Sequence, residues 1–143
     1  MITKLNVTSI KVLDQEEALD FYVNKLGLEK ANDVKQGGFR WLTVRVPGDR
    51  GTEIALEEPG PPLHDEATAA QLRELITKGA MSSLVFNSDD VRGLYDTLQA
   101  RGVTDFTQEP IEHFYGTDMG IRDPFGNAIR ILQQGKVPQK AKA

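Results

Sequence analysis

Two residues in the second half of the chain could do chemistry on a small molecule, His113 and Arg130. An imidazole can act as a general base near neutral pH, and a guanidinium can pair with a carboxylate or an enolate oxygen. Together they would suit a lyase or isomerase reaction on a carbonyl or enolisable substrate. The structural alternatives stay open: His113 is a hydrogen-bonded structural residue, and Arg130 is neutralised by Glu53 or Glu57.

A larger group of side chains is predicted to line a ligand-binding surface, because strand alternation places them on one face of a sheet. Trp41 could stack on a planar ligand, or it could belong to the core or to a dimer interface. His113 and Tyr115 are expected to alternate on one strand. Ser9 and Ser83 could instead be small packing residues. The full predicted set is Ser9, Lys11, Trp41, Thr43, Ser83, Asn87, Tyr115 and Arg130.

The composition excludes several other kinds of site. The 143 residues include no cysteine, which rules out disulfides, thiolate zinc sites and a cysteine nucleophile. With 17 basic and 21 acidic residues the formal net charge is −4, which argues against nucleic-acid binding. Phosphate-loop and Gly-x-Ser-x-Gly motifs are absent from the sequence. Without a signal peptide or a long apolar segment, the protein is expected to be cytoplasmic, with no membrane partner.

An internal repeat supplies the elements that must position these residues. In each half an apolar strand leads to an acidic N-cap and an amphipathic helix that ends at a glycine. The first helix is predicted between Asp14 and Gly27, and the second between Asp90 and Gly102. An offset of 75 to 76 residues relates the two halves. Each half is therefore predicted to be a β-α-β-β-β module.

Tandem β-α-β-β-β modules predict an α+β fold in which a curled mixed sheet surrounds a cleft. The predicted strands are 5–12, 28–34, 39–46 and 53–57, then 82–87, 105–108, 113–121 and 128–133. We expect one domain over residues 1–135, with module one at 1–58, module two at 81–135 and a flexible tail at 136–143. Residues 59–80 should bridge the modules through a helix between Asp65 and Gly79, and the alternative is a lid over the cleft.

Several short motifs point to a known family. They are Val12-Leu13-Asp14, Phe21-Tyr22, Leu26-Gly27, Asp89-Asp90-Val91, Arg101-Gly102-Val103, Tyr115-Gly116 and Asp123-Pro124-Phe125-Gly126-Asn127. In this order they resemble the vicinal oxygen chelate superfamily. That superfamily includes glyoxalase I, extradiol dioxygenases, fosfomycin-resistance enzymes and bleomycin-resistance binding proteins.

The resemblance implies four metal-ligand positions, which carry His, Gln or Glu in metal-binding members. The corresponding residues here are Val7, Ala55, Ser83 and Arg130. Valine and alanine offer no donor, a serine hydroxyl alone is a poor ligand, and an arginine would repel the metal. We therefore expect neither a metal nor another cofactor.

The resulting functional hypothesis is metal-independent capture of a small organic ligand, aromatic or drug-like, as in bleomycin-resistance proteins. A homodimer is expected, because sheets of this kind often assemble with two-fold symmetry. The lyase or isomerase reaction is the main alternative. A metal-dependent glyoxalase or dioxygenase with displaced ligands, such as His113 with Glu57, is a further alternative.

Overall fold

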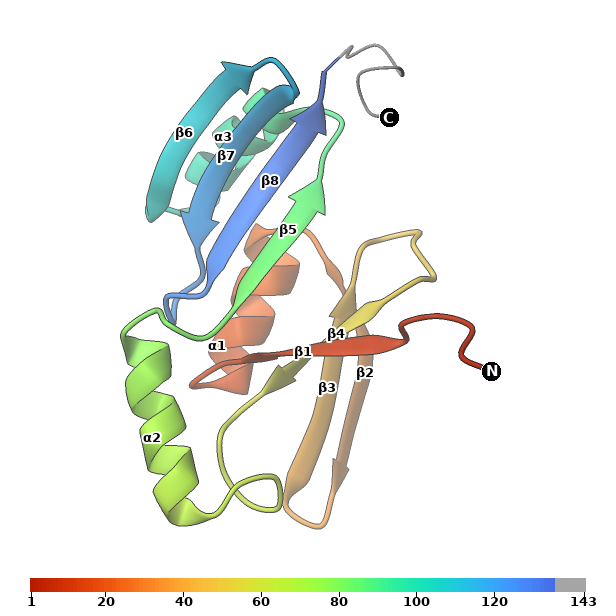
Figure 1. Cartoon of the computed structure of the whole chain (residues 1–143), viewed down its shortest axis with the longest axis vertical. Helices are drawn as coiled ribbons and strands as arrows, with labels where there is room; N and C mark the ends of the chain where they lie inside the picture. The colour runs from red at the N-terminus through yellow and green to blue at the C-terminus, as the bar shows by residue number, and fades with distance from the viewer. Residues whose placement is uncertain (136–143) are drawn as a thin grey trace. The chain divides into compact units, whose positions relative to one another are not determined.

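The computed structural model describes residues 1–135, whose eight strands form two four-stranded sheets (Figure 1). The strand orders are β1-β4-β3-β2 and β5-β8-β7-β6. The chain divides into two compact units, residues 1–82 with 124–126 and residues 83–123 with those from 127 onward. The α+β fold of tandem β-α-β-β-β modules is confirmed, whereas the predicted tail at 136–143 lies outside the described residues.

The first unit contains four strands and three helical segments. They are β1 (Val7–Lys11), α1 (Gln15–Leu19), the π-helical η1 (Asp20–Lys25), β2 (Glu29–Gln36), β3 (Phe39–Arg45), β4 (Glu53–Glu57) and α2 (Glu66–Thr77). The Asp14 side chain accepts a hydrogen bond from the Glu17 N–H and begins α1. At the other end Gly27 has a φ of 92°, which glycine adopts without strain. Both predicted ends of this helix are confirmed.

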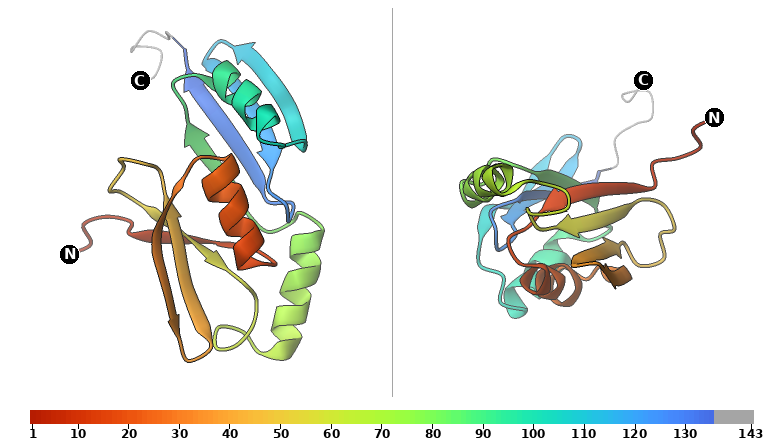
Figure 2. Two further views of the ribbon diagram at one scale, coloured as in Figure 1. Left: turned by 180° about the vertical axis from the view of Figure 1, so that it is seen from behind. Right: turned by 90° about the horizontal axis from the view of Figure 1, so that it is seen from below.

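The second unit repeats the arrangement. It contains β5 (Ser83–Asn87), α3 (Val91–Ala100), β6 (Phe106–His113), β7 (Gly116–Arg122) and β8 (Ala128–Gln134). Asp90 caps α3 by accepting the Gly93 N–H at 2.9 Å, and Gly102 follows the helix with a φ of 89°. Helix α3 lies across one face of this sheet (Figure 2), and the other face is left open by the helix. We call that second surface the open face.

The connecting segment carries the predicted helix, α2. Asp65 caps it by accepting the Thr68 N–H at 2.7 Å, and Gly79 follows with a φ of 70°. The side chains of Ala69 and Ile76 are buried. Within residues 1–135, no helix is both long and apolar enough to cross a membrane.

The hairpin that carries His113 differs from the prediction. Instead of strands 105–108 and 113–121, β6 continues to His113 and β7 begins at Gly116. Proline usually interrupts a strand, but β6 is at the edge of its sheet, and its register shifts beside Pro110. His113 therefore ends β6 and Tyr115 lies in the turn, so the expectation that they alternate on one strand is wrong.

Candidate functional site

The carboxylate of Asp118, on β7, organises the polar side chains of the open face. Its Oδ2 accepts hydrogen bonds from Arg130 Nη2 at 2.5 Å and from the Tyr115 hydroxyl at 3.3 Å. Its Oδ1 accepts one from Gln108 Nε2 at 2.9 Å and lies 3.1 Å from His113 Nε2. The Asp118 side chain is only 10% exposed, so these neighbours replace its solvent. We call these five residues the Asp118 network.

The charges in this network are well defined. Burial raises the pKa of Asp118. The hydrogen bonds from Arg130 and Gln108, together with the positive charge of Arg130, lower it by more, so the pKa lies below its ordinary value of 3.8. Asp118 and Arg130 thus form an ion pair at neutral pH. Burial also raises the pKa of Tyr115, with the Asp118 charge adding to the effect. The phenol therefore stays protonated and serves as a donor.

Strand alternation explains why these side chains share the open face. Ile129 and Ile131 of β8 are buried on the α3 side of the sheet, which turns Arg130 the other way. On β7 the buried Met119 similarly turns Asp118 to the open face. Shifting β8 by one residue would expose its isoleucines, so the position of Arg130 is set by the core.

A glycine makes room for the guanidinium. Gly120 pairs with Arg130 across β7 and β8, and a Cβ there would lie 3.0 Å from Arg130 Nη1 and 2.3 Å from Thr107 Oγ1. In the first sheet the pair at the corresponding place is Thr43 and Ala55. In the first sheet the longer side chain of the pair is thus on the third strand of the module, and in the second sheet it is on the fourth. Without a side chain at Gly120, the guanidinium can lie over β7.

Aromatic rings flank the network at the β6–β7 turn. The rings of His113 and Tyr115 stack with centroids 4.8 Å apart and planes 9° apart. Phe114 meets Tyr115 edge-on at 5.3 Å and is itself 90% exposed. We call the first pair the His113–Tyr115 stack. It provides a flat aromatic surface beside the buried carboxylate.

The structure brings together three predicted site residues, His113, Tyr115 and Arg130. Two more, Ser83 and Asn87, are exposed on β5 on either side of Val85, the residue that pairs with Arg130. Within the described part of the chain, neither side chain is hydrogen-bonded to the network. The sequence analysis missed Asp118 and Gln108, although alternation from Met119 would have placed Asp118 on the open face.

The remaining predicted residues belong to the first unit, and two of them already have side-chain partners there. Lys11 forms an ion pair with Glu57. Thr43 is fully buried and donates its hydroxyl to Glu53 at 2.7 Å. Trp41 is half-buried on β3, and Ser9 is exposed on β1.

Within its own unit Arg130 has a carboxylate partner other than the suggested Glu53 or Glu57. Those two carboxylates bind Thr43 and Lys11, and the partner of Arg130 is Asp118. Asp118 lies on β7, two residues before Gly120, which is the residue that pairs with Arg130. This diagonal pairing requires Asp118 and Arg130 to lie on the same face of the sheet. The error in the predicted bounds of the β6–β7 hairpin hides that relation.

The residues at the four positions that the resemblance gives as metal ligands do not fit a divalent cation. Val7 and Ala55 have no donor atoms, and Ser83 is exposed on an edge strand. Arg130 places a positive charge at the last position and pairs with Asp118. Residues 1–135 contain no group of three or more His, Cys, Asp or Glu side chains that could hold a metal ion. No chemistry through a metal follows from these side chains.

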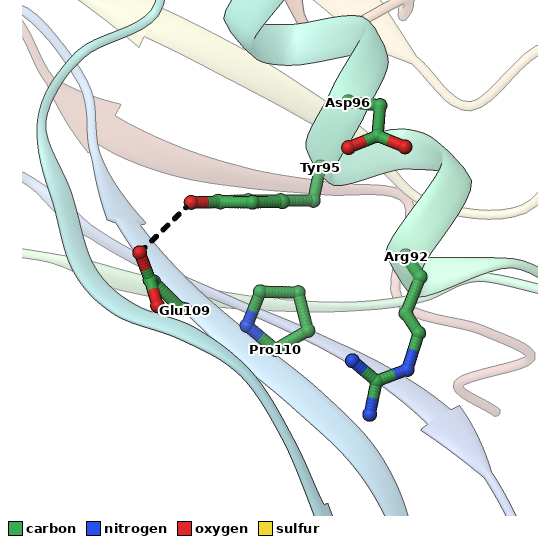
Figure 3. A pocket seen from close by; sticks show the side chains of 5 residues that line it. All are labelled: Arg92, Tyr95, Asp96, Glu109 and Pro110. Atoms are coloured by element: carbon green, nitrogen blue, oxygen red, sulfur yellow. Dashed lines mark hydrogen bonds between the residues drawn. The ribbon is translucent and has the colours of Figure 1, made fainter.

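A hollow of about 340 Å³ occurs elsewhere in the second unit, between α3 and β6 (Figure 3). Its lining consists of Arg92, Tyr95, Asp96, Glu109 and Pro110. The Tyr95 hydroxyl donates to Glu109 at 3.1 Å. Burial raises the pKa of Tyr95, and the hydrogen bond and charge of Glu109 add to this effect. None of the predicted site residues lines this hollow, so the Asp118 network is the stronger candidate site.

Comparisons with known proteins agree on one family. The model of the Glyoxalase/Bleomycin resistance protein/Dioxygenase superfamily matches residues 4–131. YurT of Bacillus subtilis (strain 168) is 38% identical over 132 residues, which are 92% of this chain and 99% of YurT. The crystal structure of UcmS2 is 40% identical with a TM-score of 0.85, covering 92% of this chain and 98% of UcmS2. TnmS3, an antibiotic binding protein from Streptomyces sp. CB03234, is 29% identical with a TM-score of 0.73, covering 94% of this chain and 98% of TnmS3.

Proposed function

Because the chain belongs to the glyoxalase/bleomycin resistance protein/dioxygenase superfamily, we propose that it captures a small organic molecule without a metal ion. The observation that carries this proposal is the Asp118–Arg130 ion pair at a metal-ligand position of the superfamily. A fixed organic cation stands where a metal ligand would be required. The site can therefore hold a ligand by hydrogen bonding and stacking, with no bond broken.

The likeness to TnmS3 supports the class of ligand. That protein is an antibiotic binding protein, and its chain is matched over 98% of its length. An antibiotic or another drug-like compound is accordingly the first class to test. We also expect a homodimer, since two-fold assemblies are the commonest among soluble oligomers.

The open face has the mixture of groups that small-molecule sites commonly use. The His113–Tyr115 stack offers an aromatic surface, and Val85, which is 70% exposed, offers an apolar one. Arg130 contributes hydrogen-bond donors. Since Asp118 and Gln108 already hold these groups in place, little side-chain entropy remains to be lost on binding.

A thermal-shift screen of chelator-treated protein against planar aromatic compounds and antibiotics tests the proposal. We expect a saturable rise in Tm with at least one compound, followed by stoichiometric binding in calorimetry. Mass spectrometry should recover the bound compound unchanged. A product of altered mass would contradict capture, and so would the lack of any saturable binding across the screen.

The second candidate is a lyase or isomerase, and one observation favours it. His113 and Arg130 both contact the carboxylate of Asp118, so a base and an oxyanion partner would lie close together if these two residues took those roles. If Nε2 donates to Asp118, the other ring nitrogen is free to accept a proton. His113→Phe separates the two functions, because it keeps a ring beside Tyr115 but removes both ring nitrogens. It should abolish turnover by an enzyme but change the affinity of a capture protein only slightly.

A further inference from the structure

We infer that the captured ligand is an organic acid, and that Arg130 binds its anionic oxygen. This inference rests on the proposed function and specifies the class of compound for the same site. It follows from three features of the Asp118 network: the donors that Arg130 has left, the saturation of Asp118, and the order in which the two charges face the solvent.

Arg130 has N–H groups that make no hydrogen bond within the described part of the chain. Its Nη2 donates to both Asp118 and Gln108, at 2.5 and 3.1 Å. Within the described part of the chain, Nη1 and Nε have no hydrogen-bond acceptor, and the side chain is 39% exposed. A guanidinium carries five N–H donors, and unused donors beside a bound ligand favour acceptor groups.

Asp118 has little left to offer a ligand. Gln108, His113, Tyr115 and Arg130 surround its two oxygens, and its side chain is 10% exposed. A ligand that carries an ammonium group would have to displace one of these neighbours. The carboxylate therefore holds the guanidinium in place but does not recruit cations.

The ion pair is neutral as a whole, yet its two charges are not equally close to the solvent. Arg130 is about four times as exposed as Asp118, at 39% against 10%. Coulomb energy falls with distance and is weakened by water, so a ligand on the open face meets the cation first.

A pair of fluorescent dyes tests the inference. 8-Anilinonaphthalene-1-sulfonate and N-phenyl-1-naphthylamine share one aromatic body, but only the first carries an anionic group. We expect the wild-type protein to bind the sulfonate about tenfold more tightly or better, as a charge-assisted hydrogen bond would provide. The preference should weaken as the salt concentration rises.

The informative variant is Arg130→Met with Asp118→Asn, which removes both charges and leaves no buried carboxylate unpaired. Its matched control is Arg92→Met with Asp96→Asn, which makes the same changes beside the hollow on α3. The preference for the sulfonate should disappear in the first variant and survive in the second. Gly120→Ala keeps both charges, but its Cβ would lie 2.3 Å from Thr107 Oγ1 and 3.0 Å from Arg130 Nη1, so both side chains must shift. It should reduce the preference for the sulfonate while an unchanged circular dichroism spectrum shows that the protein is folded.

Three results would overturn the inference. The wild-type protein could bind both dyes with equal affinity, or it could fail to bind the sulfonate. The third is a preference that persists in the Arg130→Met, Asp118→Asn variant. None of these results would contradict the capture of a neutral compound, which the screen of antibiotics and aromatic compounds decides separately.

Discussion

At the scale of single residues, Arg130 sets the chemistry of the candidate site. The resemblance to the superfamily implies a metal-ligand position here, where an arginine would repel a metal ion. The structure adds the partner, since Asp118 and Gln108 hold the guanidinium on the open face. The sequence identifies the cation but not its carboxylate. The strand that contains Asp118 is predicted to begin at His113, whereas β7 begins at Gly116, so the prediction does not place Asp118 on the open face.

Asp118→Asn should destabilise the protein by about 2 kcal/mol, because it removes the charge from buried, charge-assisted hydrogen bonds. The amide keeps the volume of the side chain, so the loss would not be a packing effect. Urea unfolding at pH 7 measures the change. Asp96→Asn, on the exposed side of α3, is the control and should change the free energy of unfolding by less than about 0.5 kcal/mol. Equal effects of the two substitutions would contradict the organising role of Asp118.

At the scale of elements, the helix ends were the most predictable features. Asp14, Asp65 and Asp90 each cap a helix as expected, because a carboxylate at an N-cap satisfies a free N–H of the first turn. The β6–β7 hairpin was predicted poorly. Pro110 suggests that the strand is interrupted, but an edge strand such as β6 can contain a proline. The turn itself, between His113 and Gly116, has no typical turn sequence before the glycine.

The neighbouring residues Asp89 and Asp90 offer a direct test of the capping argument. Only Asp90 accepts the N–H of Gly93, at 2.9 Å. We expect Asp90→Ala to reduce the free energy of unfolding by about 1 kcal/mol. Asp89→Ala, one residue earlier, should leave it within about 0.5 kcal/mol of the wild type. Similar losses from both substitutions in a denaturant titration would show that the cap is not responsible.

Arg40 joins three elements and gives the first unit a pH dependence. It donates from β3 to Asp33 on β2 at 2.8 Å and to Glu16 on α1 at 2.5 Å. The hydrogen bond from Arg40 is the main reason that the pKa of Asp33 falls from 3.8 to about 2, and the burial of Asp33 opposes it. A lowered carboxyl pKa means that the stabilisation is complete above pH 3.8 and is lost as the pH falls through about 2.

Asp33→Asn should therefore cost about 1 kcal/mol at pH 7, a figure that allows for solvent screening of this partly exposed pair. The difference from the wild type should shrink as the pH is lowered from about 4 to about 2. Thermal unfolding of both proteins over this range measures it. A difference that stays constant with pH would mean that the charge of Asp33 is not the stabilising feature.

At the scale of the whole molecule, the internal repeat explains both what was predictable and what was not. The repeat gave the module order and most strand positions, because a core of alternating apolar residues constrains both halves alike. The halves diverge on the open face, where the proposed ligand site lies. Thr43 and Ala55 in the first sheet correspond to Gly120 and Arg130 in the second, so one sheet lacks the cation that the other displays.

Ligand capture by this protein is proposed to need no metal ion, and calorimetry before and after metal removal tests that proposal. The compound from the screen is titrated calorimetrically into protein purified without chelator, then into protein stripped of metal, then after addition of Mn²⁺, Ni²⁺, Zn²⁺ or Fe²⁺. Elemental analysis accompanies each sample. We expect the same Kd and stoichiometry throughout, with no stoichiometric metal before stripping. Binding that is lost on stripping and restored by one of these ions would contradict the account.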